Sequence, residues 1–211
     1  MVHSLDQNQP ESLTTGEETE RQTPSRLQIY LWLGLMLLGL VAAVWDFQSF
    51  QLGTWHDDAN YVLLAQSILE SDKYGQINRP GEPTNARYPF GYPLLLAPLM
   101  ALFPGNWDVL KGLSLLTTLL NGASLFWGWR WFSRRSHWWG LAVAGFYLLA
   151  PLTIEHTRMI MAEPVFTLFS LIAIISAEQA AQKQEGRSWV GMTAVSLIFV
   201  AFTRTIGIAM V

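Results

Sequence analysis

Two adjacent carboxylates, Asp57 and Asp58, follow His56 and stand at the start of a helical pattern. A helix N-terminus stabilises anions and lowers their pKa values. That setting suits a carboxylate that must stay ionised to accept a proton or to hold a divalent cation such as Mg²⁺ or Mn²⁺. The plainer interpretation is an N-cap at Asp57 followed by a second first-turn acid. The spacing alone favours the plainer interpretation.

A second candidate is the segment 87–93, RYPFGYP, in which two prolines and a glycine predict a rigid loop. Arg87 and Tyr88 could donate hydrogen bonds from this loop to a phosphate or a sugar. The alternative is a loop that only turns the chain back into a membrane. On sequence physics alone that alternative is the stronger one.

Three further charged residues are candidates because of where they lie in apolar surroundings. Arg158 lies in a short stretch between two apolar runs, and Glu163 begins the second of them, followed by Pro164 at a favoured early helical position. Helix-start chemistry therefore explains Glu163 without any function. Arg204 lies deep in the last apolar run, where an arginine is unfavourable. It could bind an anion or extend to the membrane interface.

The elements that must position these residues are apolar. The chain has 211 residues, 51% of them hydrophobic and only 14% charged, whereas a soluble domain carries about a quarter charged residues. The absence of cysteine excludes disulfides and thiolate catalysis. No P-loop, dinucleotide fingerprint or HExxH motif occurs, and no basic pattern indicates nucleic-acid binding. The composition predicts an integral membrane protein.

Five apolar runs predict an all-α, polytopic membrane fold with about five transmembrane helices. The first run is about 19 residues, or roughly 28 Å as a helix, which is enough to span a bilayer. A sixth run, 94–103, is too short to span. Residues 1–26 are polar and predict a disordered tail. The five runs are 27–45, 107–132, 138–152, 163–181 and 189–211, and the chain ends inside the last, as expected of the N-terminal portion of a longer protein.

Basic residues predict the orientation, because positive clusters face the cytoplasm. The clusters are Arg21 and Arg26, Arg134 and Arg135, and Lys183 and Arg187. They predict a cytoplasmic N-terminus, a large outward loop over residues 46–106 and a short outward loop over 155–162. The large loop contains an amphipathic helix, 58–70, expected to lie along the membrane surface. Its apolar stripe is Tyr61, Leu64, Ala65 and Ile68, and its polar face is Asn60, Gln66, Ser67 and Glu70.

Four short motifs, in order over about residues 30–210, resemble the GT-C superfamily of membrane glycosyltransferases. The resemblance is to the protein O-mannosyltransferase and aminoarabinose-transferase-like branch. The motifs are DDANY at 57–61, RYPFGYPLLLAP at 87–98, MAEP at 161–164 followed by Phe166, and Thr203-Arg204. The branch usually has Glu where this chain has Asp58, two prolines where it has Pro89-Phe90, and a proline after the arginine where it has Thr205.

The resemblance implies an enzyme that moves a sugar from a polyprenyl-phosphate carrier to a lipid, polysaccharide or protein acceptor. The reaction would take place on the outer face of a plasma or inner membrane. Asp57 would be the catalytic carboxylate and Arg204 would face the carrier phosphate. A divalent cation at Asp57 and Asp58 would be a possible cofactor. Two other classes stay open: a transporter or flippase of lipid-linked saccharides, and a non-catalytic membrane partner.

Overall fold

The computed structural model describes residues 23–71, 73–81, 83–84, 87–132, 137–182 and 186–205. Within these ranges the regular elements are helices, as predicted, and a lone antiparallel bridge joins Gly75 to Thr84. The predicted tail lies almost wholly outside the described residues, as do Arg21, Arg134, Arg135 and Lys183 of the basic clusters. The helices are α1 (Arg26–Val44), α2 (Asp57–Glu70), α3 (Gly91–Leu102), α4 (Trp107–Phe132), α5 (His137–Leu149), α6 (Pro151–Thr157), α7 (Glu163–Gln182) and α8 (Arg187–Thr203).

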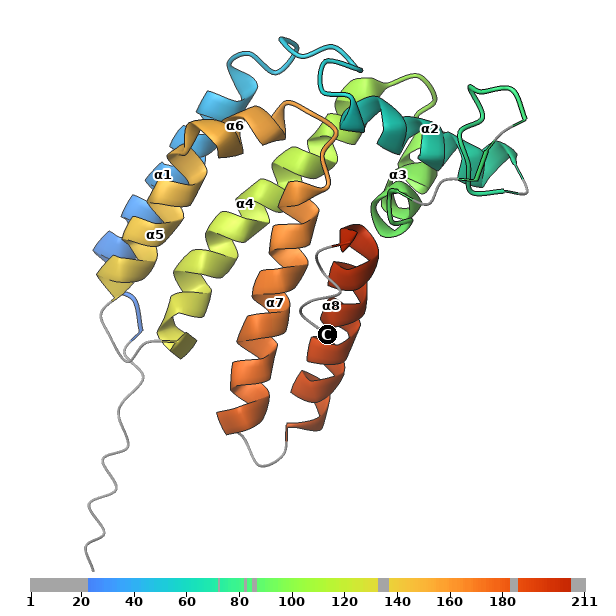
Figure 1. Ribbon diagram of the computed structural model, residues 1–211. Coiled ribbons are helices and arrows are strands. Elements are labelled where there is room, and N and C mark those ends of the chain that lie inside the picture. Colours follow the sequence, from blue (N-terminus) through green and yellow to red (C-terminus); the bar gives the residue numbers. More distant parts are fainter. Residues whose placement is uncertain are drawn as a thin grey trace, which may run out of the picture.

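The long helices form a bundle in which α1 packs on α5, α5 on α4, α4 on α7 and α7 on α8 (Figure 1). Three helical segments are long and apolar enough to cross a membrane: Arg26–Val44, Trp107–Gly128 and Glu163–Gln182. They coincide with three of the five predicted runs. Together they are consistent with an integral membrane protein.

The predicted span 138–152 is not one straight helix. Helices α5 and α6 meet at an angle of 60° around Ala150, whose backbone is extended (φ −63°, ψ 129°). Pro151 explains the break, because a residue that precedes proline avoids the helical region and proline itself lacks the N–H of a continuing helix. If the bent pair is one span, the described chain has four candidate spans.

The fifth predicted run also differs from the structure. Helix α8 ends at Thr203 after 17 residues, and Arg204 follows it in extended backbone (φ −143°, ψ 143°). Residues 206–211 of the predicted run lie outside the described residues. The short run 94–103 is part of α3, which begins at Gly91, inside the segment predicted to be a loop.

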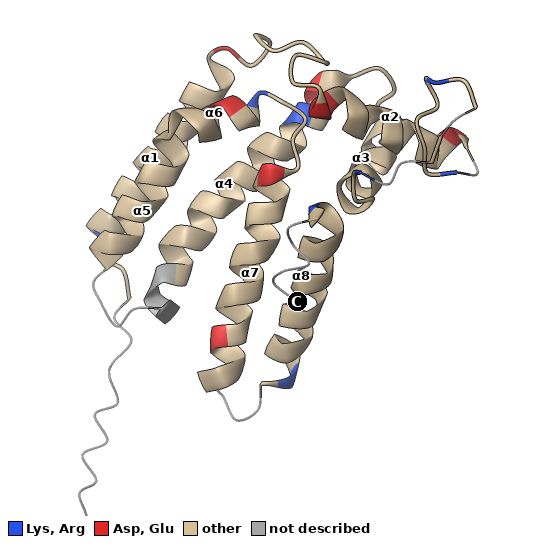
Figure 2. Cartoon of the chain, in the orientation of Figure 1, with Lys and Arg blue, Asp and Glu red and all other residues tan. Residues whose placement is uncertain are grey.

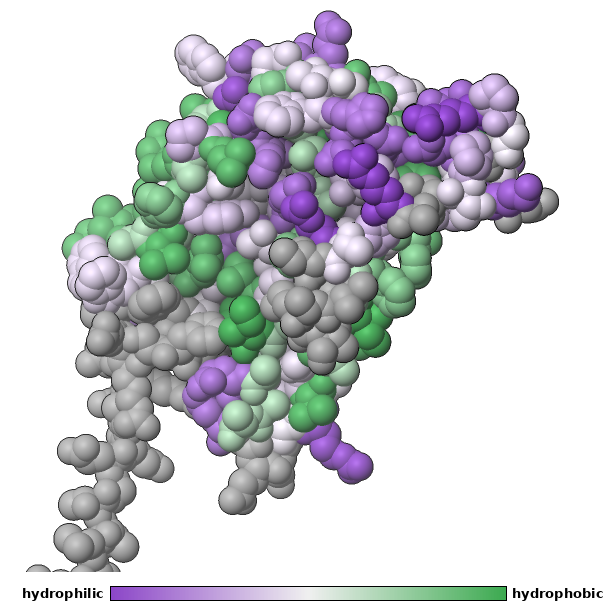
Figure 3. Space-filling view, in the orientation of Figure 1, coloured by the Kyte–Doolittle hydropathy of each residue, from purple (hydrophilic) through white to green (hydrophobic). Residues whose placement is uncertain are grey.

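Helices α2, α3 and α6 lie at one end of the bundle, and the end of α7 and the start of α8 lie at the other (Figure 1). Charged residues gather at the α2–α6 end and again near the end of α7 and the start of α8, with few between them (Figure 2). Hydrophilic residues cover the α2–α3 end, whereas hydrophobic residues lie along the bundle (Figure 3). The charged residues that the structure describes are therefore concentrated towards the ends of the apolar helices.

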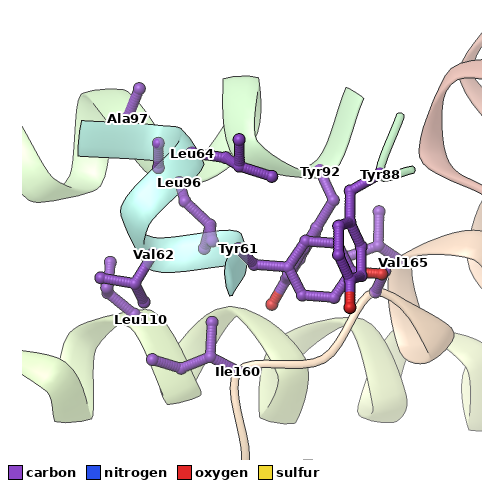
Figure 4. Close-up of a cluster of buried hydrophobic side chains, with 12 residues drawn as sticks. Tyr61, Val62, Leu64, Tyr88, Tyr92, Leu96, Ala97, Leu110, Ile160 and Val165 are labelled. Atoms are coloured by element: carbon purple, nitrogen blue, oxygen red, sulfur yellow. The ribbon is translucent and has the colours of Figure 1, made fainter. Parts of the chain in front are cut away.

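The apolar face of α2 is buried against α3. Tyr61, Leu64 and Ala65 are almost wholly inaccessible in one core cluster, and Ile68 packs against it (Figure 4). The four stripe residues share one face of α2, and that face packs against protein, whereas the sequence placed it along a membrane surface. Ser67, predicted to lie on the polar face, is also buried. Its hydroxyl donates to the Leu64 carbonyl (2.9 Å) and accepts from the Gly75 N–H (3.4 Å).

Candidate functional site

Asp57 is the first residue of α2 and not its N-cap, which is His56. The predicted cap is therefore displaced by one residue. The Asp57 carboxylate is half-buried, and its Oδ1 accepts a hydrogen bond from the Tyr88 hydroxyl at 2.5 Å. This contact ties the start of α2 to the proline-rich segment before α3. The Asp57 carboxylate thus binds Tyr88, another residue predicted to belong to the site, and does not cap its own helix.

Asp58 has a different environment from its neighbour. It is buried, and its two carboxylate oxygens accept from the Gly53 N–H (3.1 and 3.0 Å), while Oδ1 also accepts from the Ala59 N–H (2.6 Å). Burial raises the pKa of Asp58 above its usual 3.8, against the lowering effect of these N–H groups. The helix terminus was predicted to lower it. Asp58 therefore holds the preceding loop in place, which makes it a positioning residue.

Glu163 and Arg204 form an ion pair. The Glu163 Oε1 to Arg204 Nη1 distance is 2.7 Å, and the pair joins the first residue of α7 to the residue that follows α8. The side chains are 25% and 40% exposed, respectively. The second carboxylate oxygen of Glu163, Oε2, is buried and has no hydrogen-bond partner among the described residues. Arg204 thus has a fixed partner and still reaches solvent.

Tyr61 is a buried tyrosine near Asp57, Tyr88 and the ion pair. Burial raises the pKa of Tyr61, and the negative charges of Glu163 and Asp57 raise it further, whereas the positive charge of Arg204 lowers it. Its ring lies edge-on to Tyr88, with a centroid distance of 5.3 Å. Figure 4 shows this tyrosine group at one end of the core cluster. Four residues singled out from separate parts of the sequence are therefore gathered around one buried tyrosine.

The tyrosines themselves include residues that sequence reasoning did not assign to the site. Tyr61 was predicted as part of an apolar stripe and as the last residue of the DDANY motif, one helical turn after Asp57, but was given no role in the site. Tyr92 is fully buried, edge-on to Tyr61 at a centroid distance of 4.9 Å. Tyr92 lies four residues after Tyr88, in the same segment that the sequence singled out, and α3 begins between the two residues. That shared segment was the signal that could have assigned Tyr92 to the site. Both aromatic rings fix the position of Tyr61 in the site.

A close backbone approach brings the start of α3 to the end of α8. A Cβ atom built on Gly91 would lie 2.5 Å from the Phe202 carbonyl oxygen, so only glycine fits at that position. The rings of Phe90 and Phe202 pack at a centroid distance of 4.7 Å. This contact places Arg204, two residues after Phe202, next to the segment that carries Tyr88.

The two remaining predicted residues are Arg87 and Arg158, and they lie in different surroundings. The Arg87 guanidinium lies over the Tyr88 ring, 5.5 Å from its centroid. Arg158 lies elsewhere: it donates to the carbonyls of Ala42 (2.8 Å) and Ala43 (3.4 Å) at the end of α1. These are carbonyls that a helix C-terminus leaves without intrahelical partners. Arg158 therefore caps α1.

The part of the chain that the structure describes holds no group of three or more His, Asp or Glu side chains placed to bind one ion. The oxygens of Asp58, moreover, already accept backbone N–H groups. What the site offers is a half-buried carboxylate beside a tyrosine hydroxyl, with an arginine–glutamate pair close by.

The fold and this site define a helical protein with candidate membrane spans and a cluster of ionisable groups at its polar end. Comparisons of the chain with protein-family models, with curated proteins and with solved structures found no match. The functional inference therefore depends on the side chains and their arrangement.

Proposed function

We propose that this chain is a membrane glycosyltransferase of the GT-C type. It moves a sugar from a polyprenyl-phosphate carrier to a lipid, polysaccharide or protein acceptor. The observation that supports the proposal is that Tyr61 packs against Tyr88, which binds Asp57, and also lies within reach of the charges of Glu163 and Arg204. A carboxylate that can take a proton and an arginine that can meet a phosphate are the two groups this transfer needs, and they lie at one polar end.

The proposal includes a membrane orientation. Helices α1, α4 and α7, the bent pair α5–α6 and helix α8 would make five crossings of a plasma or inner membrane. Helix α8, with 17 residues, is about 26 Å long. The N-terminus, the end of α7 and the start of α8 would face the cytoplasm, and α2 and α3 would face outward. The placement of α2 and α3 at the opposite end of the bundle from the end of α7 and the start of α8 supports this orientation (Figure 1).

In the proposed reaction an acceptor hydroxyl attacks the anomeric carbon of the donor sugar. Asp57 accepts the hydroxyl proton as the new carbon–oxygen bond forms. The bond from the anomeric carbon to the phosphate oxygen breaks, and the polyprenyl phosphate leaves with its electron pair. Arg204 offsets the negative charge that develops on this leaving group.

Two neighbours would prepare these groups for the reaction. Tyr88, through its hydrogen bond to Oδ1, would orient the Asp57 carboxylate. Glu163 would hold Arg204 at the end of α8 until the phosphate arrives. Charge-assisted hydrogen bonds of this kind are short and directional, so they can fix both side chains before substrate binds.

Transfer of labelled sugar from polyprenyl-phosphate donors, by the full chain in proteoliposomes, tests the proposal. Asp57→Asn keeps the shape of the side chain and an acceptor for Tyr88 but cannot take a proton. Transfer should fall by about 10²–10⁴-fold. The control is Glu70→Gln, which removes an exposed carboxylate at the last residue of α2, outside the site.

Three outcomes are distinguishable. Loss of transfer in Asp57→Asn alone supports the enzyme and the base. Equal transfer by the parent and Asp57→Asn rejects the base and leaves Asp57 a structural residue. Absence of transfer by the parent with mannosyl, glucosyl and aminoarabinosyl carriers rejects the proposed function in favour of a transporter or a non-catalytic partner.

A further inference from the structure

A cavity of about 450 Å³ opens on the other side of the start of α2, where Asp58 forms part of its wall. The rest of the wall comes from the segment 48–52, the first turns of α4 and the segment 158–160. Pockets for small ligands have volumes of about 300–1,000 Å³. The cavity is therefore large enough for a small organic molecule and is separate from the group around Tyr61.

The two cations in the wall are already occupied. The Lys111 ammonium donates to the Phe50 carbonyl (2.8 Å) and the Phe47 carbonyl (3.4 Å), and it lies 3.7 Å from Asp108. Asp108 and Lys111 are three residues apart on α4, a spacing that places their side chains side by side. Lys111 is also buried. Its charge therefore holds the 46–50 segment against α4 and is not free to bind an anion.

Arg158 is occupied in the same way. It donates to two carbonyls at the end of α1 and lies 3.9 Å from Asp46. Around the cavity, the two cations Lys111 and Arg158 thus face the three carboxylates of Asp46, Asp58 and Asp108. With all five ionised the formal sum is −1. A phosphate or another anion would meet no net attraction there.

The groups that remain open to a ligand are aromatic faces and uncharged amides. Trp107 is 40% exposed and Phe50 is half-buried. Gln51 is exposed, and Gln48 reaches Asp108 by one long hydrogen bond of 3.4 Å. An aromatic face packs against the C–H side of a sugar ring, while amide and carboxylate oxygens accept from its hydroxyls. We infer that this cavity binds a neutral sugar ring.

Sugar binding at the cavity is separable from the transfer reaction. The inference comes from the cavity's charge and lining, and it can be measured with no carrier present. If the proposed transferase is correct, α2 separates two sites. The sugar-binding cavity lies on its Asp58 side, and the proton acceptor and the arginine lie on its Asp57 side.

Saturation-transfer NMR tests the inference with the full chain in lipid nanodiscs. The probes are methyl α-mannopyranoside and methyl α-glucopyranoside, with inorganic phosphate as the competing anion. We expect saturation of the sugar C–H protons, with no displacement by phosphate. Trp107→Ala should weaken binding about five- to tenfold. Gln51→Ala, an exposed position with little risk to folding, should weaken it about twofold to fivefold.

The matched control is Trp139→Ala, which removes an exposed indole on α5, at the opposite end of the bundle. Wild-type affinity in Trp139→Ala together with a loss in Trp107→Ala supports the cavity. Absence of saturation with both glycosides, equal binding by all three variants, or displacement of the sugar by phosphate would each overturn the inference. The Asp57→Asn variant should bind the glycosides as the parent does, so failure of sugar transfer and failure of sugar binding are seen separately.

Discussion

The ion pair between Glu163 and Arg204 should couple the start of α7 energetically to the end of α8. A double-mutant cycle measures that coupling free energy. The variants are Glu163→Gln, Arg204→Gln and the double substitution. Each removes a charge and keeps a polar side chain of similar size. Because both single changes break the same contact, the double variant should be only slightly less stable than either single variant.

The size of the coupling follows from the geometry. Two unit charges about 4 Å apart interact by about 4 kcal/mol at an effective dielectric constant of about 20. The side chains are 25% and 40% exposed, so water screens part of this attraction. Exposed pairs contribute about 0.2–1 kcal/mol, and breaking a buried pair costs about 3–5 kcal/mol. We expect a coupling free energy of about 1–2 kcal/mol.

Unfolding in mixed micelles, followed by tryptophan fluorescence, gives the free energies. The control cycle combines Arg204→Gln with Asp108→Asn, whose positions share no contact and should be additive to within about 0.5 kcal/mol. A Glu163–Arg204 cycle that is equally additive would refute the reasoning. In that case the 2.7 Å contact contributes nothing measurable to the packing of α7 on α8, and Arg204 is not held in place by Glu163.

Three other predictions concern α3 and the acidic pair. Gly91→Ala should destabilise the fold by about 1–3 kcal/mol, because its Cβ would overlap the Phe202 carbonyl; Gly112→Ala, with no atom within 4 Å of its Cβ, should be neutral or stabilising by up to about 1 kcal/mol in the same unfolding assay. Burial raises the pKa of Asp58 above 3.8, so ionisation of this carboxyl group disfavours the folded state. The wild-type protein should therefore lose melting temperature relative to Asp58→Asn as the pH rises through that raised pKa. A difference in melting temperature that is independent of pH between 3.5 and 8 would contradict this. Tyr88→Phe should lower kcat for sugar transfer about tenfold or more at unchanged melting temperature, because the Asp57 carboxylate loses a charge-assisted hydrogen bond, and unchanged kcat would remove Tyr88 from the site.

The helices of the bundle were largely predictable, because hydrophobic run length reports directly on whether a segment can span a bilayer. The runs 27–45, 107–132 and 163–181 coincide with the three candidate spans. The break at Ala150 was not predicted, although Pro151 was visible, because a proline near the end of an apolar run can mark either an exit or a bend. The direction that the chain takes after such a break depends on tertiary packing, here the packing of α6 against α4 and α1.

The site was predictable residue by residue but not as an arrangement. Glu163 and Arg204 are 41 residues apart, and nothing local to either residue indicates that they meet. The different environments of Asp57 and Asp58 also depend on residues outside their own helix. Asp58 accepts hydrogen bonds from the Gly53 N–H in the loop before α2, whereas Asp57 accepts one from Tyr88 in the segment before α3.

The anchoring of the segment after α1 has a consequence for how the protein is made. Its carbonyls are held by Lys111, 61 residues after Phe50, and the end of α1 is held by Arg158, 116 residues after Ala42. At a synthesis rate of about 5–20 residues per second, the second contact becomes available only about 6–23 s after Ala42 is made. During that interval these backbone groups depend on water or on a chaperone, so slower elongation upstream of residue 158 should expose the segment to proteolysis.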